Sequence, residues 1–133
     1  MKLLDTNVII RFLTRDDKRK AKKCRILFEK VLTGELKLFI TNLAVAEVVW
    51  VLEKVYKLSK RAIRLNIEAI LNTPNLVFQN RGIISESIIL YDIHGIDFIN
   101  VYHKIYMLKS GIKEIYSYDK DFDMFADIVR IEP

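Results

Sequence analysis

Acidic side chains follow or interrupt short apolar segments at several points in this chain. Apolar segments of this length are usually core strands, so the residues that leave them gather near one edge of a sheet. Carboxylates gathered at one edge repel each other, and a divalent cation relieves that repulsion. Hard oxygen ligands without paired histidines or cysteines indicate Mg²⁺ or Mn²⁺. The acids concerned are Asp5, Glu47, Asp97, Asp119 and Asp121.

Glu47 stands out because its neighbours are apolar. It lies among Ala44, Val45, Val48 and Val49 in a stretch with helical spacing. A carboxylate is costly to bury unless it is paired. We therefore expect Glu47 to belong to a functional site rather than to ordinary surface.

Two of the other acids also have purely structural interpretations. Asp5 precedes Thr6 and Asn7 and could cap a helix, while residues 119–123 could form an ordinary polar turn. The residue types alone do not choose between a cap and a metal ligand.

The apolar pattern predicts strands that alternate with helices within one domain spanning residues 1–133. Strands are expected at 2–4, 36–40, 76–78, 114–118 and 128–131, and helices at 7–13, 16–32, 44–56, 59–71, 83–93 and 98–108. This alternation predicts an α/β protein with a mainly parallel sheet of four to five strands, covered by helices on both faces. Asp5 and Asp119 would be neighbours if the first and fourth strands were adjacent.

The charge distribution favours a polyanionic partner. The net charge is +5, and Lys and Arg bind phosphates through counterion release. One basic stretch surrounds Lys18, Arg19, Lys22 and Lys23, and a second runs from 54 to 64. Either stretch could instead be ordinary solvated helix surface.

Cysteine content and hydropathy point to the cytoplasm. Cys24 is the single cysteine, which excludes an intramolecular disulfide. The start of the chain has no signal-peptide pattern, and no apolar run approaches the roughly 20 residues of a membrane span. We expect no membrane partner.

Four motifs together resemble the PIN-domain proteins of the VapC-type toxin-ribonuclease group. They are Leu4-Asp5-Thr6-Asn7, Thr41 with Ala46-Glu47, the segment from Ile96 to His103, and the segment from Tyr116 to Phe122. The resemblance implies a PIN-like three-layer α/β/α sandwich. It also implies an endoribonuclease that uses Mg²⁺ or Mn²⁺ to hydrolyse RNA phosphodiester bonds, acting as the toxin of a type II toxin-antitoxin pair.

The resemblance assigns roles to individual residues. Asp5 matches the first metal-binding acid and Glu47 the second, while Asp119 matches the fourth, with Asp121 close by. Polar residues beside these acids would orient them or a metal-bound water. These are Thr6, Asn7 and Thr41.

The chain departs from the family at the third acid. The motif usually reads Asp-Phe-X-Asp, and the second Asp is here Asn100. An amide oxygen can bind a hard cation but brings no charge. Asp97, three residues earlier, could take over the role. The alternatives are a catalytically impaired PIN-fold module that binds RNA or protein, and a DNA-directed nuclease.

The resemblance also implies protein partners, namely an antitoxin and a second copy of the chain. The early helices would supply the dimer surface, with Ile9, Ile10, Phe12 and Leu13 as candidates. Aromatic residues are interpreted as core or interface residues, Trp50 among them, although some could stack on a base. The stacking candidates are Tyr91, Tyr102 and Tyr118.

Overall fold

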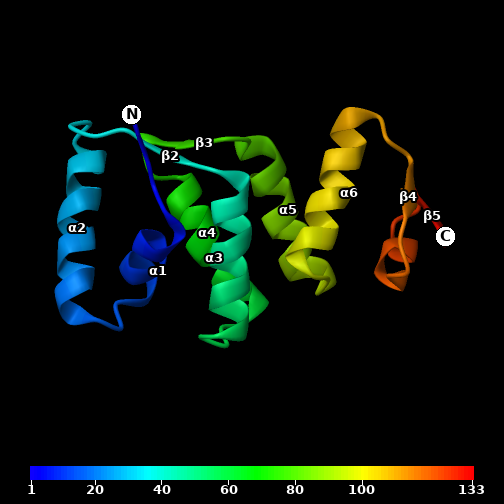
Figure 1. The fold of residues 1–133 in the computed structure, drawn as a ribbon, viewed down its shortest axis with the longest axis horizontal. Helices are drawn as coiled ribbons and strands as arrows, with labels where there is room; N and C mark the ends of the chain where they lie inside the picture. The colour runs from blue at the N-terminus through cyan, green and yellow to red at the C-terminus, as the bar shows by residue number, and fades with distance from the viewer.

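The computed structural model describes residues 1–133 as α-helices connected to short β-strands (Figure 1). The strands are β1 (Lys2–Leu3), β2 (Leu38–Ile40), β3 (Leu76–Phe78), β4 (Glu114–Tyr116) and β5 (Val129–Ile131). The helices are α1 (Thr6–Thr14), α2 (Lys18–Leu32), α3 (Asn42–Lys54), α4 (Lys60–Leu71), α5 (Arg81–His94), α6 (Phe98–Ser110) and the 3₁₀-helix η1 (Lys120–Met124). Every predicted strand and helix is present, with small differences at the ends.

The paired strands are all parallel but form two sheets. One sheet has the order β1-β2-β3, and the other contains β4 and β5. The α/β class with parallel strands is thus confirmed, whereas the expected single sheet of four to five strands is divided. β1 and β4 are not neighbours, and α5 and α6 lie between the two sheets (Figure 1).

Helix ends follow the local signals in the sequence. The hydroxyl of Thr41 accepts a hydrogen bond from the backbone N–H of Ala44 at 3.1 Å, and the hydroxyl of Ser59 caps α4 in the same way. Gly95 and Gly111 end α5 and α6 with φ angles of 66° and 72°. A glycine tolerates these left-handed angles without steric cost.

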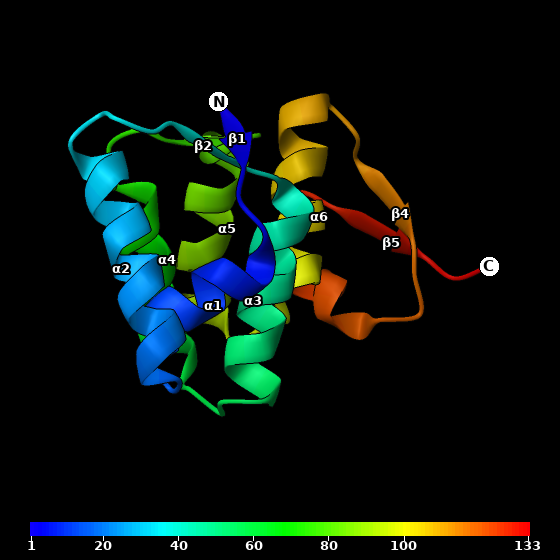
Figure 2. The same cartoon turned by 60° about the vertical axis from the view of Figure 1, so that its left-hand side comes forward.

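The interior is formed mainly by apolar helix faces, and α1 contributes to it directly. Ile9 and Ile10 are buried, and the rings of Phe12 and Phe28 stack with centroids 4.0 Å apart. Figure 2 shows α1 between α2 and α3. The expectation of a dimer surface is therefore wrong for Ile9 and Ile10, which are buried within the monomer, whereas Phe12 and Leu13 are partly buried against the same core.

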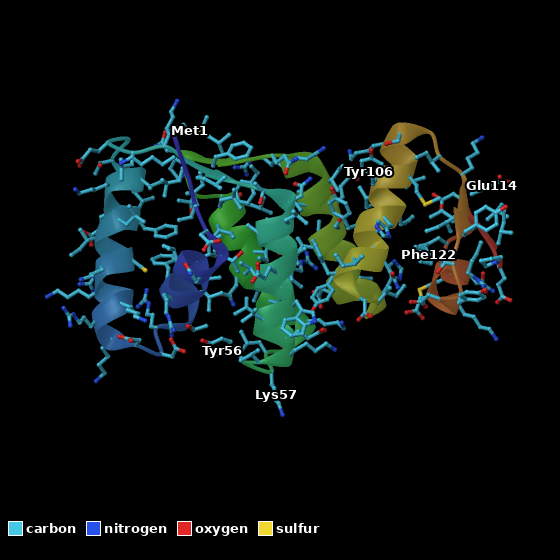
Figure 3. All side chains as sticks on the ribbon, viewed as in Figure 1. Met1, Tyr56, Lys57, Tyr106, Glu114 and Phe122 are labelled. Atoms are coloured by element: carbon cyan, nitrogen blue, oxygen red, sulfur yellow. The ribbon has the colours of Figure 1, made fainter.

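The C-terminal segment is attached through packing and ion pairs. Phe122 is 2% exposed and lies on the side of η1 that faces α6 (Figure 3). Arg130 on β5 binds both carboxylate oxygens of Asp123, at 2.9 and 3.2 Å. A two-stranded sheet is marginal by itself. The Arg130 ion pair joins β5 to η1, and Phe122 packs η1 against α6. None of the helices combines the length and the apolar character that crossing a membrane would need.

Candidate functional site

A first acidic group lies where β1 leads into α1, beside α3. Asp5 occupies the N-cap position of α1, yet its exposed carboxylate makes no capping hydrogen bond. Thr6 is 6% exposed, and its hydroxyl donates a hydrogen bond to Oε2 of Glu47 at 3.2 Å. Asp5, Asn7 and Glu47 line the same pocket. The capping interpretation of Asp5 thus has no supporting contact, and Thr6 orients Glu47 rather than Asp5.

Glu47 is exposed, although its neighbours along the chain are apolar. Ala44, Val45, Val48 and Val49 face the core, whereas Glu47 lies on the exposed side of α3. The helical period of 3.6 residues separates the two faces. Glu47 remains a site candidate because of its contact with Thr6 and its place beside Asp5.

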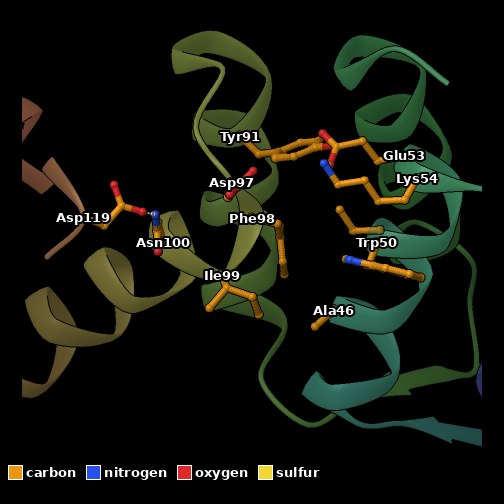
Figure 4. A pocket seen from close by; sticks show the side chains of 11 residues that line it. Ala46, Trp50, Glu53, Lys54, Tyr91, Asp97, Phe98, Ile99, Asn100 and Asp119 are labelled. Carbon is orange, nitrogen blue, oxygen red and sulfur yellow. Dashed lines mark hydrogen bonds and ion pairs between the residues drawn. The ribbon is translucent and has the colours of Figure 1, made fainter. Parts of the chain in front are cut away.

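A second polar group joins α6 to the start of η1. The amide Nδ2 of Asn100 donates to Oδ2 of Asp119 at 2.7 Å (Figure 4). The backbone N–H of Asp121 donates to Oδ1 of Asp119 at 3.0 Å. The Asp121 hydrogen bond, followed by that of Asn100, lowers the pKa of Asp119 below its usual value. Asp119 also caps η1, so it has a local structural role in addition to the expected role as a metal ligand.

A cleft between α3 and α6 contains the second group. Its volume is about 210 Å³, and Trp50, Asp97, Asn100 and Asp119 are among its lining residues. Asp97 precedes α6 at the N-cap position, but its side chain makes no capping hydrogen bond. We call this hollow the Trp50 cleft.

The two acidic groups do not meet. The pocket of Asp5 and Glu47 shares no lining residue with the Trp50 cleft, which contains Asp97 and Asp119. No set of three or more acidic, histidine or cysteine side chains is close enough to hold an ion. The separation follows from the strand arrangement, because β1 and β4 belong to different sheets.

The expected ligand set therefore does not fit one metal ion as it is arranged here. Carboxylate and amide oxygens are suitable donors for Mg²⁺ or Mn²⁺, but the expected ligands Asp5, Glu47, Asn100, Asp119 and Asp121 are not brought together. Thr41, expected to orient a ligand, caps α3 instead and lies in neither acidic pocket.

A partly buried network on the wall of the Trp50 cleft, which Glu53 and Tyr91 help to line, was not predicted. The hydroxyl of Tyr91 donates to Oε1 of Glu53 at 2.9 Å, and Nζ of Lys60 donates to the same oxygen at 2.7 Å. Burial, reinforced by Glu53, raises the pKa of Tyr91 above its usual value. Tyr91 is fully buried, which agrees with its interpretation as a core residue and excludes the alternative role in base stacking. In the sequence, the apolar helical neighbours of Tyr91 were the only indication that it is buried.

The two basic stretches differ in their surroundings. In the stretch 54–64, Lys60 pairs with Glu53, and Arg64 pairs with Glu68 and Asp92. Most of that charge is compensated within the protein. On α2 the four expected RNA-binding residues are exposed and make no ion pair. They are Lys18, Arg19, Lys22 and Lys23.

The basic face of α2 lies close to the first acidic group. Lys18 and Lys22 line one hollow, and Lys23 lines another. The hollow of Lys23 shares Asn7 and Arg11 with the pocket of Asp5 and Glu47. A chain of phosphates on α2 would therefore lead towards these two carboxylates.

These features define a small α/β protein with parallel strands and carboxylates that follow the strands. The model of the PIN domain family matches residues 2–128. A VapC ribonuclease from Aquifex aeolicus (strain VF5) is 32% identical over 122 residues, which cover 92% of this chain and 90% of that protein. The chain belongs to the PIN domain family. This confirms the resemblance and the PIN-like α/β/α class.

Among solved structures, the comparison finds Mycobacterium tuberculosis VapC20, a toxin that cleaves the sarcin-ricin loop. It is 18% identical, the alignment covers 100% of both chains, and the TM-score is 0.42. Family membership rests on the PIN model and on the Aquifex aeolicus relative.

Proposed function

We propose that this protein is an endoribonuclease that hydrolyses RNA phosphodiester bonds and acts as the toxin of a type II toxin-antitoxin pair. The observation that carries the proposal is the match of nearly the whole chain to a VapC ribonuclease. Asp5, Glu47 and Asp119 all lie within the residues that match the PIN family. The motifs that could do the chemistry are therefore part of the shared domain rather than additions to it.

The catalytic set that we propose is Asp5, Glu47 and Asp119, with Asn100 or Asp97 in the place of the third acid. Asp5 presents a carboxylate that no capping bond occupies. Thr6 holds one oxygen of Glu47 and leaves the other available. Hydrogen bonds from Asp121 and Asn100 lower the pKa of Asp119. These side chains thus supply oriented negative charge from two sides of α3.

A divalent ion is general for VapC-type PIN nucleases. We propose Mg²⁺ or Mn²⁺ here because the available donors are hard oxygens, with Asp121 as a further acid near Asp119. When bound, such an ion lowers the pKa of a water and stabilises charge on the phosphate. The two acidic groups do not enclose one ion in the present arrangement.

The basic face of α2 is the proposed site for the RNA backbone. Lys18, Arg19, Lys22 and Lys23 are exposed and have no acidic partner. Phosphate contacts by such residues supply affinity that does not depend on sequence. The shared edge between the hollow on α2 and the Asp5 pocket would direct a bound strand towards the acids.

Partners follow from the same assignment. VapC toxins act on RNA and pair with VapB antitoxins, and we propose an antitoxin partner for this chain. We also propose a homodimer and action in the cytoplasm, where RNA substrates are present. Sedimentation across micromolar concentrations tests the dimer, and purely monomeric behaviour would exclude it.

One observation favours a second candidate, an impaired PIN-fold module that binds RNA or protein. Asn100 donates its amide to Asp119 and adds no charge where the family motif has an acid. A site with fewer charges binds divalent cations less tightly. Binding without cleavage would then be the expected behaviour.

Cleavage assays on structured RNAs test the proposal. We expect cleavage that requires Mg²⁺ or Mn²⁺ and is lost in Asp5→Asn. Asp127→Asn, which removes an exposed carboxylate outside both acidic pockets, is the matched control. A DNA of the same sequence tests the remaining alternative. Preferential cleavage of DNA, or equal cleavage by Asp5→Asn, would contradict the assignment.

A further inference from the structure

The strongest unassigned feature is an exposed indole between the two acidic groups. Trp50, the only tryptophan of the chain, is 56% exposed. Ala46 and Trp50 on α3 face Phe98 and Ile99 across the Trp50 cleft (Figure 4). Large aromatic rings are usually buried to a high degree, so an indole left open in a cleft suggests a ligand with a flat apolar face.

The polar groups of the cleft narrow the identity of that ligand. Asp97 makes no capping bond. The amide nitrogen of Asn100 donates to Asp119, and its carbonyl oxygen accepts no hydrogen bond. Both are hydrogen-bond acceptors. Lys54 is the cation of the cleft, and it pairs with Glu53 at 3.4 Å. The complementary ligand has a planar ring that carries N–H donors at its edge.

Size and position fit one base of an RNA strand. The cleft volume of about 210 Å³ is below the roughly 300–1,000 Å³ of pockets for drug-sized ligands. Trp50 follows Glu47 by three residues on α3, so the cleft lies one helical turn from the carboxylate that Thr6 holds. Single-stranded RNA is read by stacking on aromatic rings and by hydrogen bonds to base edges.

We propose that Trp50 stacks on an unpaired nucleobase of the RNA substrate and that Asp97 accepts a hydrogen bond from the amino group of that base. The proposal rests on the ribonuclease function and adds a determinant of specificity. Adenine, guanine and cytosine carry such an amino group. Uracil has none, and its single ring N–H lies between two carbonyl oxygens that the carboxylate repels. Trp50 is then a positioning residue for the strand.

The fluorescence of this single tryptophan tests the proposal directly. The Asp5→Asn variant with Mg²⁺ is titrated with a short single-stranded oligoribonucleotide and with an abasic ribose-phosphate oligomer of equal length. We expect saturable quenching by the first and none by the second. The affinity for the abasic oligomer should be lower by about 5- to 150-fold. Oligouridylate should bind more weakly than the oligomers of the other bases.

Trp50→Ala in the same Asp5→Asn background has no tryptophan, so its binding is measured by the anisotropy of dye-labelled oligomers. It should remove the difference in affinity between the two oligomers and leave the affinity for the abasic oligomer unchanged. Quenching by both oligomers, or equal loss of affinity for both in Trp50→Ala, would overturn the stacking. Equal affinity for all four bases would overturn the role of Asp97. If wild-type protein cleaves RNA without any base-dependent quenching, the base site is overturned and the nuclease function is kept. Base-dependent quenching without cleavage by the wild type leaves the base site standing and overturns the nuclease function.

Discussion

The hydroxyl of Thr6 donates a hydrogen bond to the carboxylate of Glu47 across 3.2 Å, connecting the first residue of α1 to the middle of α3. Thr6 is buried while Glu47 is exposed. The fixed hydroxyl therefore limits the positions that a mobile surface carboxylate can adopt. Asp5 lines the same pocket, so this hydrogen bond sets the relation between the first two acids of the proposed site.

Replacing Thr6 by valine should uncouple these residues without disturbing the core, because valine has nearly the same shape. We expect stability to change by no more than about 1 kcal/mol. Cleavage should fall by roughly 10- to 100-fold, the usual cost of losing a group that orients a ligand. Thr6→Ser retains the hydroxyl and should retain most of the activity. Equal rates for Thr6→Val and wild type would show that the hydrogen bond has no functional role.

Replacing Tyr91 by phenylalanine should alter the dependence of stability on pH. The pKa of Tyr91 is raised in the folded protein by burial and by Glu53. The unfolded chain releases this proton near pH 10, so the stability that Tyr91 contributes is fully present below about pH 10 and is lost as the pH rises towards the folded pKa. Unfolding in urea between pH 8 and 11 measures the effect. Wild type should lose stability more steeply than Tyr91→Phe, which should be about 1 kcal/mol less stable at neutral pH.

Tyr118→Phe is the matched control for this experiment. Tyr118 is 72% exposed, so removing its hydroxyl should leave the stability and its pH dependence unchanged. Parallel curves for wild type and Tyr91→Phe would contradict the buried network.

The helices and strands were predictable from the sequence because their signals are local. Thr41 and Ser59 cap helices where expected, and glycine ends α5 and α6. The apolar period also identified most of the core. Ile9 and Ile10 were misassigned to a surface because a short apolar helix looks the same whether it faces its own core or a partner.

The arrangement of the site was not predictable to the same extent. Whether Asp5 approaches Asp119 depends on the order of strands in the sheet, which no local pattern encodes. Lys60 and Arg64 form ion pairs with residues distant in the sequence. The sequence therefore could not show whether the charges of a basic stretch are available or are neutralised by acidic partners. The exposure of Trp50 likewise depends on how α3 faces α6.

Reversing the charge of the α2 face should weaken RNA binding. Replacing Lys18, Arg19, Lys22 and Lys23 by glutamate removes exposed cations with no acidic partner. The slope of the logarithm of the binding constant against the logarithm of the salt concentration is negative. Its magnitude should decrease by roughly one unit for each phosphate that the variant no longer binds. A control with the same change in charge replaces exposed residues on other elements, namely Lys37, Lys57, Arg61 and Lys113. An unchanged slope, or the same change in the control, would leave α2 as solvated surface.

Two variants show whether Asn100 or Asp97 replaces the third acid of the family. Asn100→Asp places a second carboxylate beside Asp119, whose Oδ2 lies 2.7 Å from the amide nitrogen of Asn100. Repulsion should loosen this contact without metal, and a divalent ion should then bind more tightly and raise cleavage. Asp97→Asn should reduce the rate at saturating RNA only if Asp97 has taken over the role, because loss of base recognition alone weakens RNA binding instead. Unchanged metal affinity in Asn100→Asp, together with loss of activity in Asp97→Asn, would assign the role to Asp97.

Metal-dependent thermal stability decides whether the two acidic groups hold the same ion. A ligand that binds only the folded state raises the free energy of unfolding, by about 2.7 kcal/mol at a concentration 100 times its Kd. We expect millimolar Mg²⁺ or Mn²⁺ to raise the melting temperature of the wild type, and Asp5→Asn to abolish the shift. Asp119→Asn is the second variant to compare, because Asp119 lies in the other acidic group. Loss of the shift in both variants means that the groups converge on one ion. A shift that survives in Asp119→Asn confines the ion to Asp5 and Glu47, and a shift that survives in Asp5→Asn contradicts the proposed metal site.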